Sequence, residues 1–123
     1  MIKGIGTDLL EINRIAKVLA RSPKIANRIL TDREFADFSQ SLQPARYLAK
    51  RFAAKEAVVK ALGTGIGNGV SWQHIEITKD ILGKPLINLN SGALKRAQLL
   101  DASHYHLSYS DERNFIVAMV VIE

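Results

Sequence analysis

Two acidic residues and one lysine are the side chains in this sequence best suited to metal and phosphate chemistry. Glu56 and Lys60 lie in the segment RFAAKEAVVKALGTGIGNG, residues 51–69, where strong helix formers are followed by a tail rich in glycine. Asp8 lies far from them along the chain, close to the N-terminus. Carboxylates bind divalent cations and lysine binds phosphate oxygens, so these residues are candidates for a site that holds a metal ion and a phosphate group.

Simpler roles are open for the same residues. Glu56 and Lys60 are four positions apart, and a surface ion pair between them would contribute only about 0.2 to 0.5 kcal/mol to helix stability. Asp8 comes shortly before a helical segment, and an aspartate in that position often caps the helix. Residues 51–69 alone leave both interpretations of Glu56 and Lys60 open, whereas the surroundings of Asp8 favour contact with a ligand.

The motifs that are absent narrow the chemistry. The chain of 123 residues has no cysteine, which excludes disulfides, thiolate metal sites and cysteine nucleophiles. It also has no Walker lysine loop, no serine elbow and no HExxH motif. Two carboxylates on separate elements could form an octahedral Mg²⁺ site together with phosphate oxygens and water. The sequence therefore predicts phosphoryl or phosphodiester chemistry on a phosphate-rich substrate.

The N-terminal residues 1–11 alternate in polarity as a β-strand does. In such a strand Asp8 shares one face with Gly4, Gly6 and Leu10. Glycine weakens a strand, and strand glycines often mark a place where another backbone or a ligand comes close. Asp8 is therefore expected beside a point of close approach.

A long helix is expected to carry Glu56. Pro44 suits its first position, and Gly63 is expected to end it because glycine readily adopts the left-handed conformation. On a helical wheel Glu56 lies at the edge of the apolar face, so its carboxylate is expected at the rim of the core. That apolar face contains Leu48, Phe52, Val59 and Leu62.

The other segments complete an α+β pattern. They are helices on both sides of Ser22-Pro23, a helix over 34–40 that begins with a Thr31–Glu34 capping box, a hairpin over 74–80 and 85–90, a helix from Ser91 to about Leu100 that Ser91 caps, and strands over 104–110 and 115–122. We expect one small domain over residues 1–123, with an antiparallel sheet packed against the long helix. The continuous apolar run of 115–122 predicts a strand buried on both faces.

Two polar residues of the strand over 104–110 share one face. His106 and Ser108 alternate with apolar neighbours, so both point to the same side of the sheet. A single histidine on a strand is usually a structural residue with satisfied hydrogen bonds, and His106 is kept as a site candidate beside that interpretation.

A row of five bases follows the first strand. They recur every three or four residues between positions 12 and 30, where no acidic residue occurs: Arg14, Lys17, Arg21, Lys24 and Arg28. Such a row is often only a solvated surface, but its unrelieved repulsion favours a partner of opposite charge, either a protein with acidic helices or a nucleic acid. No aromatic residue alternates with the bases, which disfavours a nucleic acid.

No segment approaches the roughly 18 uninterrupted apolar residues of a transmembrane helix. The N-terminal sequence MIKGIGTDLL also lacks the apolar run of a secretory signal. We expect neither a membrane span nor export, and a cytoplasmic location is consistent with the absence of cysteine.

Four motifs resemble those of one known family. They are GIGTDLLEI at 4–12, RFAAKEAVVKALGTG at 51–65, GKP at 83–85 and HLSYSDE at 106–112. From end to end the chain is similar to the holo-(acyl-carrier-protein) synthases, which are small phosphopantetheinyl transferases. The resemblance implies transfer of 4'-phosphopantetheine from coenzyme A to a serine of an apo acyl carrier protein, with release of adenosine 3',5'-bisphosphate, in fatty acid biosynthesis.

The resemblance also implies roles for individual residues. It implies that Asp8 and Glu56 bind Mg²⁺ and act in catalysis with Lys60. By the same resemblance, the coenzyme A contacts are Arg51, Phe52, Lys60, Gly63, Thr64, Gly65, Pro85, His106 and Ser108. The row Arg14, Lys17, Arg21, Lys24 and Arg28 falls where the family binds the acidic helix of its carrier protein. Family members form homotrimers that share active sites between neighbouring subunits, and neither a nucleic acid nor a membrane is an expected partner.

One position departs from the family pattern. Many members have a histidine directly after the serine of the C-terminal motif, where this chain has Asp111. A role of that histidine does not transfer to Asp111.

Overall fold

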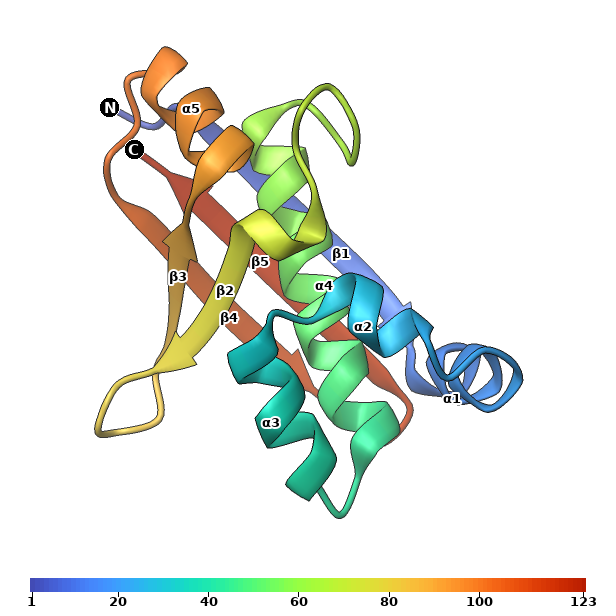
Figure 1. Cartoon of the computed structure of the whole chain (residues 1–123). Coiled ribbons are helices and arrows are strands. Elements are labelled where there is room, and N and C mark those ends of the chain that lie inside the picture. Colours follow the sequence, from blue (N-terminus) through green and yellow to red (C-terminus); the bar gives the residue numbers. More distant parts are fainter.

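Helix α4 (Pro44–Leu62) runs across one face of an antiparallel sheet at the centre of the molecule (Figure 1). The computed structural model describes residues 1–123. Strands β1 (Gly4–Glu11), β5 (Phe115–Ile122) and β4 (Tyr105–Asp111) lie side by side in that order. A second sheet consists of the hairpin of β2 (Ile75–Lys79) and β3 (Pro85–Leu89). The predicted α+β fold, with an antiparallel sheet against the long helix, is confirmed.

Shorter helices surround this centre. They are α1 (Ile12–Arg21), α2 (Ile25–Ile29), α3 (Asp32–Gln40), the 3-10 helix η1 (Trp72–His74) and α5 (Ser91–Leu99). All the α-helices among them pack against α4 (Figure 1). None of the helices has both the length and the apolar character that a bilayer crossing requires.

Local signals at helix ends behave mostly as predicted. Pro44 is the first residue of α4, and Gly63 ends it in the left-handed conformation with φ 75°. Thr31 and Glu34 form the predicted capping box. The prediction that Ser91 caps α5 is wrong, because Asn90 occupies the cap position and Ser91 is the first helical residue, with φ 50°.

Strand β1 lies directly against the backbone of α4. A Cβ atom on Gly4 would overlap the carbonyl oxygen of Ala61, and one on Gly6 would overlap that of Ala57. The strand and the helix therefore pack without intervening side chains. The close approach beside Asp8 is confirmed, and the approaching group is the backbone of α4. Contact between Asp8 and a ligand stays a prediction.

The outer face of the three-stranded sheet has no helix over it. Residues of β5 alternate, so that Ile116, Ala118 and Val120 are fully buried while Val117 and Met119 are 37% and 47% exposed. The prediction that this strand is buried on both faces is therefore wrong for the single chain, because α4 covers only one side. Neighbouring apolar side chains of β1 are exposed on the same outer face.

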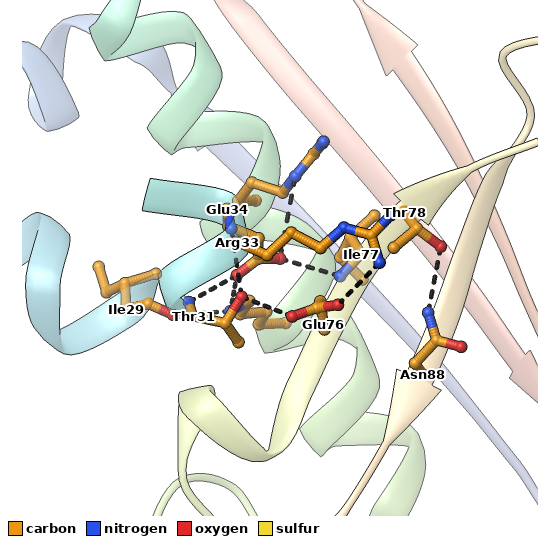
Figure 2. A network of polar contacts seen from close by, with 10 residues as sticks. Ile29, Thr31, Arg33, Glu34, Glu76, Ile77, Thr78 and Asn88 are labelled. Carbon is orange, nitrogen blue, oxygen red and sulfur yellow. Dashed lines mark hydrogen bonds and ion pairs between the residues drawn. The ribbon is translucent and has the colours of Figure 1, made fainter. Parts of the chain in front are cut away.

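A buried polar network connects α3, α4 and β2 (Figure 2). The carboxylate of Glu34 accepts hydrogen bonds from Thr31 N, Lys55 Nζ and Ile77 N at 2.9, 2.6 and 2.9 Å. Lys55 is completely buried and also donates to the carbonyl of Ile29 at 2.6 Å. Burial lowers the pKa of Lys55, and Glu34 opposes that shift. The network fixes the last turn of α2 and the start of α3 to the middle of α4.

Candidate active site

Lys60 connects α4 to β1. Its Nζ donates hydrogen bonds to Oδ1 of Asp8 at 3.2 Å and to the carbonyl oxygen of Thr7 at 2.8 Å. The Asp8 side chain is 16% exposed and that of Lys60 is 53% exposed. The alternative in which Lys60 pairs with Glu56 on the helix surface is wrong, since Lys60 pairs with Asp8. The alternative in which Asp8 caps α1 is also wrong, because the cap residue is Glu11.

Glu56 is held by a tryptophan that the sequence reasoning missed. Trp72 Nε1 donates a hydrogen bond of 2.9 Å to Oε1 of Glu56. The Trp72 ring also packs against that of Phe52, with 5.9 Å between ring centroids. Trp72 is the only tryptophan in the chain and follows the glycine-rich loop, which was the one available signal. The three residues form the wall of the candidate site on the side of η1.

The packing register brings Asp8 toward Glu56. Gly4 lies against Ala61 and Gly6 against Ala57, so β1 runs antiparallel to α4, with two strand residues for each helical turn. Continuing this register by one step places Asp8 beside Ala53, in the turn of α4 that also contains Glu56. The two carboxylates are distant in sequence and come from adjacent backbones.

The donor set fits a divalent cation that shares its coordination with a substrate. One oxygen of each carboxylate is engaged, Asp8 Oδ1 with Lys60 and Glu56 Oε1 with Trp72, while Oδ2 and Oε2 form no hydrogen bond within the chain. The structure contains no group of three or more acidic or histidine side chains that could hold a metal ion by themselves. An ion held here would take its other ligands from phosphate and water, as Mg²⁺ commonly does.

The glycine loop, residues 63–69, begins at the end of α4 and is open. Gly65 has φ 63°, and no atom lies within 4 Å of the position that its Cβ would occupy. Thr64 Oγ1 donates to the carbonyl of Gly65 at 2.8 Å. Arg96 of α5, which the sequence reasoning also missed, donates from Nε to the carbonyl of Leu62 at 2.9 Å. The loop therefore offers exposed backbone beside Lys60, with a second cation at its start.

Arg51 lies in the core, away from these residues. Only 4% of it is exposed; its guanidinium lies 4.6 Å from the centre of the Tyr47 ring, and its Nε is 3.9 Å from Glu34 Oε2. Burial in this cluster raises the pKa of Tyr109 to about 12. Contact between Arg51 and coenzyme A stays a prediction.

His106, Ser108 and Pro85 lie apart from Asp8 within one chain. His106 and Ser108 are exposed on the outer face of β4, whereas Asp8 is on the inner face of β1, opposite Ala118. His106 Nε2 is 2.7 Å from Oε2 of Glu123. Pro85 begins β3, which lies beside β4. Of the predicted coenzyme A contacts, His106 and Ser108 thus lie on the face of the sheet opposite to Asp8.

The predicted row of bases is an exposed surface without ion pairs. Arg14, Lys17, Arg21, Lys24 and Arg28 are all exposed, and none lies within ion-pair distance of an acidic side chain. An apolar pocket of about 250 Å³ lies between this surface and the candidate site. Its lining comprises Leu10, Arg14, Ile15, Val18, Ile25, Ile29, Phe52 and Trp72. The pocket joins the basic surface to the residues that pack around Glu56.

Asp111 has a structural role in this chain. It forms an ion pair with Arg46, and its other oxygen lies 3.5 Å from Lys50 Nζ. Arg46 also donates to the carbonyls of Glu112 and Arg113 at 2.9 and 2.7 Å. These contacts attach the turn between β4 and β5 to the first half of α4.

Comparisons with known proteins agree with this architecture. The family model described as "4'-phosphopantetheinyl transferase superfamily" matches residues 4–120. A holo-(acyl-carrier-protein) synthase from Shewanella loihica is 54% identical over 132 residues, covering 100% of this chain and 98% of that protein.

Solved structures show the same similarity. The holo-(acyl-carrier-protein) synthase from Neisseria meningitidis superposes with a TM-score of 0.92 at 46% identity, covering 100% of this chain and 99% of that chain. A holo-(acyl-carrier-protein) synthase from Bacillus anthracis in complex with CoA (3',5'-ADP) gives a TM-score of 0.84 at 41% identity, with coverage of 100% and 97%. The chain is therefore a transferase that belongs to the 4'-phosphopantetheinyl transferase superfamily, in its holo-(acyl-carrier-protein) synthase group.

Proposed function

We propose that this enzyme transfers 4'-phosphopantetheine from coenzyme A to a serine of an apo acyl carrier protein in an Mg²⁺-dependent reaction. The products are the holo carrier protein, used in fatty acid biosynthesis, and adenosine 3',5'-bisphosphate. The observation that carries the proposal is the convergence of Asp8, Lys60 and the turn of Glu56 where β1 lies against α4. The Bacillus anthracis relative, solved with CoA (3',5'-ADP), supports the donor and the nucleotide product. We expect the reaction to take place in the cytoplasm.

Asp8 and Glu56 are the residues that would hold Mg²⁺. Each presents one carboxylate oxygen that is free of protein hydrogen bonds, and the two carboxylates come from adjacent backbones. When bound there, Mg²⁺ would neutralise the diphosphate of coenzyme A and make its phosphorus more electrophilic.

Lys60 and Glu56 supply the chemistry of the chain itself. Lys60 is half exposed and binds the oxygens of the diphosphate, so that its charge stabilises the negative charge that develops on the leaving group. The carrier serine oxygen attacks the phosphorus that bears pantetheine, and the bond to the bridging oxygen breaks. Glu56 accepts the serine proton, either directly or through a water molecule, while Trp72 keeps the carboxylate oriented through Oε1.

The basic surface of α1 and α2 binds the carrier protein. Its five unpaired bases complement an acidic helix, and the neighbouring pocket accepts an apolar side chain of the partner. Because Phe52 and Trp72 line this pocket and Trp72 holds Glu56, a carrier bound there presents its serine to the site.

The chain acts as a homotrimer in which neighbouring subunits share sites. The open sheet face carries Ile5 and Leu9 of β1 beside Val117 and Met119 of β5, all at least partly exposed. An apolar sheet face of this kind requires cover from another molecule. His106 and Ser108 lie on this same face, so a neighbouring subunit would bring them to its partner's coenzyme A.

A single measurement tests the function. Purified protein is incubated with Mg²⁺, coenzyme A and an apo carrier protein, and the carrier is followed by intact-mass spectrometry. We expect the carrier to gain the mass of one phosphopantetheine, and Glu56→Gln to abolish the gain. An unchanged carrier mass at saturating coenzyme A would reject the proposed function.

A further inference from the structure

Helix α5 supports both ends of the glycine loop. A Cβ atom on Gly92 would overlap the carbonyl oxygen of Gly69, so the end of the loop lies directly on the first turn of α5. One turn later, Arg96 Nε donates a hydrogen bond of 2.9 Å to the carbonyl of Leu62, where α4 ends and the loop begins. Residues four apart lie on the same face of a helix, so this face of α5 closes the loop.

The contact with Leu62 uses only part of the Arg96 guanidinium. Nη1 and Nη2 have no hydrogen-bond partner in the chain, and Arg96 forms no ion pair with an acidic residue. Nη2 lies 3.6 Å from the position that a Cβ atom of Gly63 would take. Arg96 is partly exposed, and neither of these unpaired nitrogens is fully buried. An arginine that is anchored at Nε and free at both Nη atoms is well oriented for a bidentate contact with phosphate.

Arg96 also lies in line with the catalytic candidates. Glu56, Lys60 and Gly63 follow each other at spacings of four and three residues, so they occupy one side of α4. The rise from Glu56 to Gly63 is about 10 Å at 1.5 Å per residue. A ligand whose diphosphate is bound by Lys60, and which extends along α4 toward Leu62, would approach the guanidinium of Arg96.

A phosphate group at this end of α4 requires a positive charge. The C-terminal end of a helix carries a partial negative charge and repels anions. Arg96 forms a hydrogen bond with the last carbonyl of α4 and places its charge at that end, which removes the obstacle.

We propose that Arg96 binds a phosphate group of the coenzyme A nucleotide through Nη1 and Nη2, while its Nε holds the start of the glycine loop. This role rests on the proposed function, since it takes coenzyme A as the donor. Coenzyme A carries phosphate in two places, the diphosphate and the 3'-phosphate of the ribose. Dephospho-coenzyme A, which lacks the 3'-phosphate, separates the two sources.

The test compares Arg96→Met and Arg96→Gln with Lys95→Met, which removes an exposed base from the adjacent position of α5. KM and kcat are measured with coenzyme A and with dephospho-coenzyme A. Both Arg96 variants are expected to raise the KM for coenzyme A by roughly ten- to a hundredfold, the usual effect of losing charge-assisted hydrogen bonds, with little change in kcat. Lys95→Met is expected to resemble the wild type.

The measurements with dephospho-coenzyme A identify which phosphate group Arg96 binds. A 3'-phosphate contact predicts that the Arg96 variants and the wild type have the same KM for dephospho-coenzyme A, whereas a diphosphate contact predicts a raised KM for both donors. The proposal is overturned if the Arg96 variants match Lys95→Met with coenzyme A. It is also overturned if Arg96→Gln, which keeps an uncharged donor for the Leu62 carbonyl, restores the wild-type KM. A wild-type protein without transfer activity would instead reject the proposed function.

Discussion

The indole nitrogen of Trp72 lies 2.9 Å from Oε1 of Glu56 and donates a hydrogen bond to it. The tryptophan is in turn packed against Phe52, one helical turn before Glu56. A carboxylate at the rim of a core has several rotamers, and this hydrogen bond selects one of them. The carboxylate is thereby oriented before a ligand binds.

The first prediction concerns that hydrogen bond. Trp72→Phe keeps an aromatic ring against Phe52 and removes the donor, so Glu56 loses its orientation while the wall of the site stays apolar. We expect the Mg²⁺ concentration for half-maximal activity to rise by about tenfold or more, as for other residues that orient a metal ligand. The measurement is an activity titration with Mg²⁺. Unchanged Mg²⁺ dependence would show that Trp72 does not orient a metal ligand.

The second prediction concerns the packing of β1 on α4. Gly6→Ala places a methyl group onto the carbonyl of Ala57, and relief requires the strand to move away from the helix. We expect a loss of about 3 kcal/mol in the free energy of unfolding, measured with urea. Gly65→Ala is the matched control, because Gly65 has φ 63° but no atom near its Cβ position, and we expect a loss of about 1 kcal/mol from backbone strain alone. Equal losses would mean that the close approach is not a constraint on stability.

The third prediction assigns the basic surface to the carrier protein. Reversing Arg14 and Arg21 to Glu removes attraction for an acidic helix and leaves Asp8, Glu56 and Lys60 untouched. We expect the KM for the carrier to rise by roughly a hundredfold and the KM for coenzyme A to change by less than about threefold. Lys79→Glu, a reversal on the exposed end of β2, is the control. Equal effects on both substrates would contradict a carrier-binding surface.

The fourth prediction concerns stability at high pH. Burial raises the pKa of Tyr109 from 10.0 to about 12, and its hydroxyl has no hydrogen-bond partner. Because the pKa is higher in the folded state, the stabilisation is complete below pH 10 and is lost as the pH rises through about 12. Ionisation of Tyr109 is expected to lower the free energy of unfolding by about 2 to 3 kcal/mol as the pH rises from 10 to about 12.

Urea unfolding of the wild type and Tyr109→Phe at pH 9 and pH 12 isolates this contribution. The variant also removes a buried hydroxyl without a partner, so it is expected to be at least as stable as the wild type at pH 9. Its stability at pH 12 should exceed that of the wild type. If the free energy of unfolding falls equally in the wild type and in Tyr109→Phe between pH 9 and pH 12, Tyr109 is not the titrating group.

Local signals in the sequence were enough to predict the elements. Pro44 and Gly63 set the ends of α4, Ser22-Pro23 separates α1 from α2, and the Thr31–Glu34 capping box starts α3. Each of these effects acts within a few residues, so it is readable without knowledge of the fold. Ser91 is the exception, because the chain enters α5 one residue earlier, at Asn90.

Contacts between elements were not predictable in the same way. From the sequence, Glu56 was as plausible an ion-pair partner of Lys60 as any other acidic residue. Lys60 pairs with Asp8 because the glycines of β1 let that strand approach α4. Trp72 and Arg96 reach the site from elements that carry no motif of their own. The apolar run of β5 predicted burial, but a sequence does not state whether its own chain or another copy provides the cover.

The fifth prediction concerns that uncovered face. Met119→Glu introduces a charge at the centre of the outer sheet surface, where the wild-type side chain is 47% exposed in the single chain. We expect the proposed trimer to dissociate into folded monomers without activity, as measured by sedimentation, circular dichroism and transfer assays. Ile81→Glu is the matched control, because Ile81 is fully exposed on the turn between β2 and β3. We expect this variant to keep the oligomeric state and the activity of the wild type. A trimeric, active Met119→Glu would place the interface elsewhere.

Mixing two inactive variants separates a shared site from a purely structural trimer. In one chain Asp8 and His106 lie on opposite sides of the sheet, so a site that uses both must combine two subunits. Asp8→Ala and His106→Ala are each expected to be poorly active. After dissociation and reassociation in equal amounts, about a quarter of the interfaces would combine an intact Asp8 with an intact His106, and activity should recover toward that fraction of the wild type. If each chain used only its own residues, every site in the mixture would retain one of the two defects and no activity would return. Recovery therefore requires that the side chains act across the interface, whereas its absence would confine catalysis to the Asp8, Glu56 and Lys60 group of a single subunit.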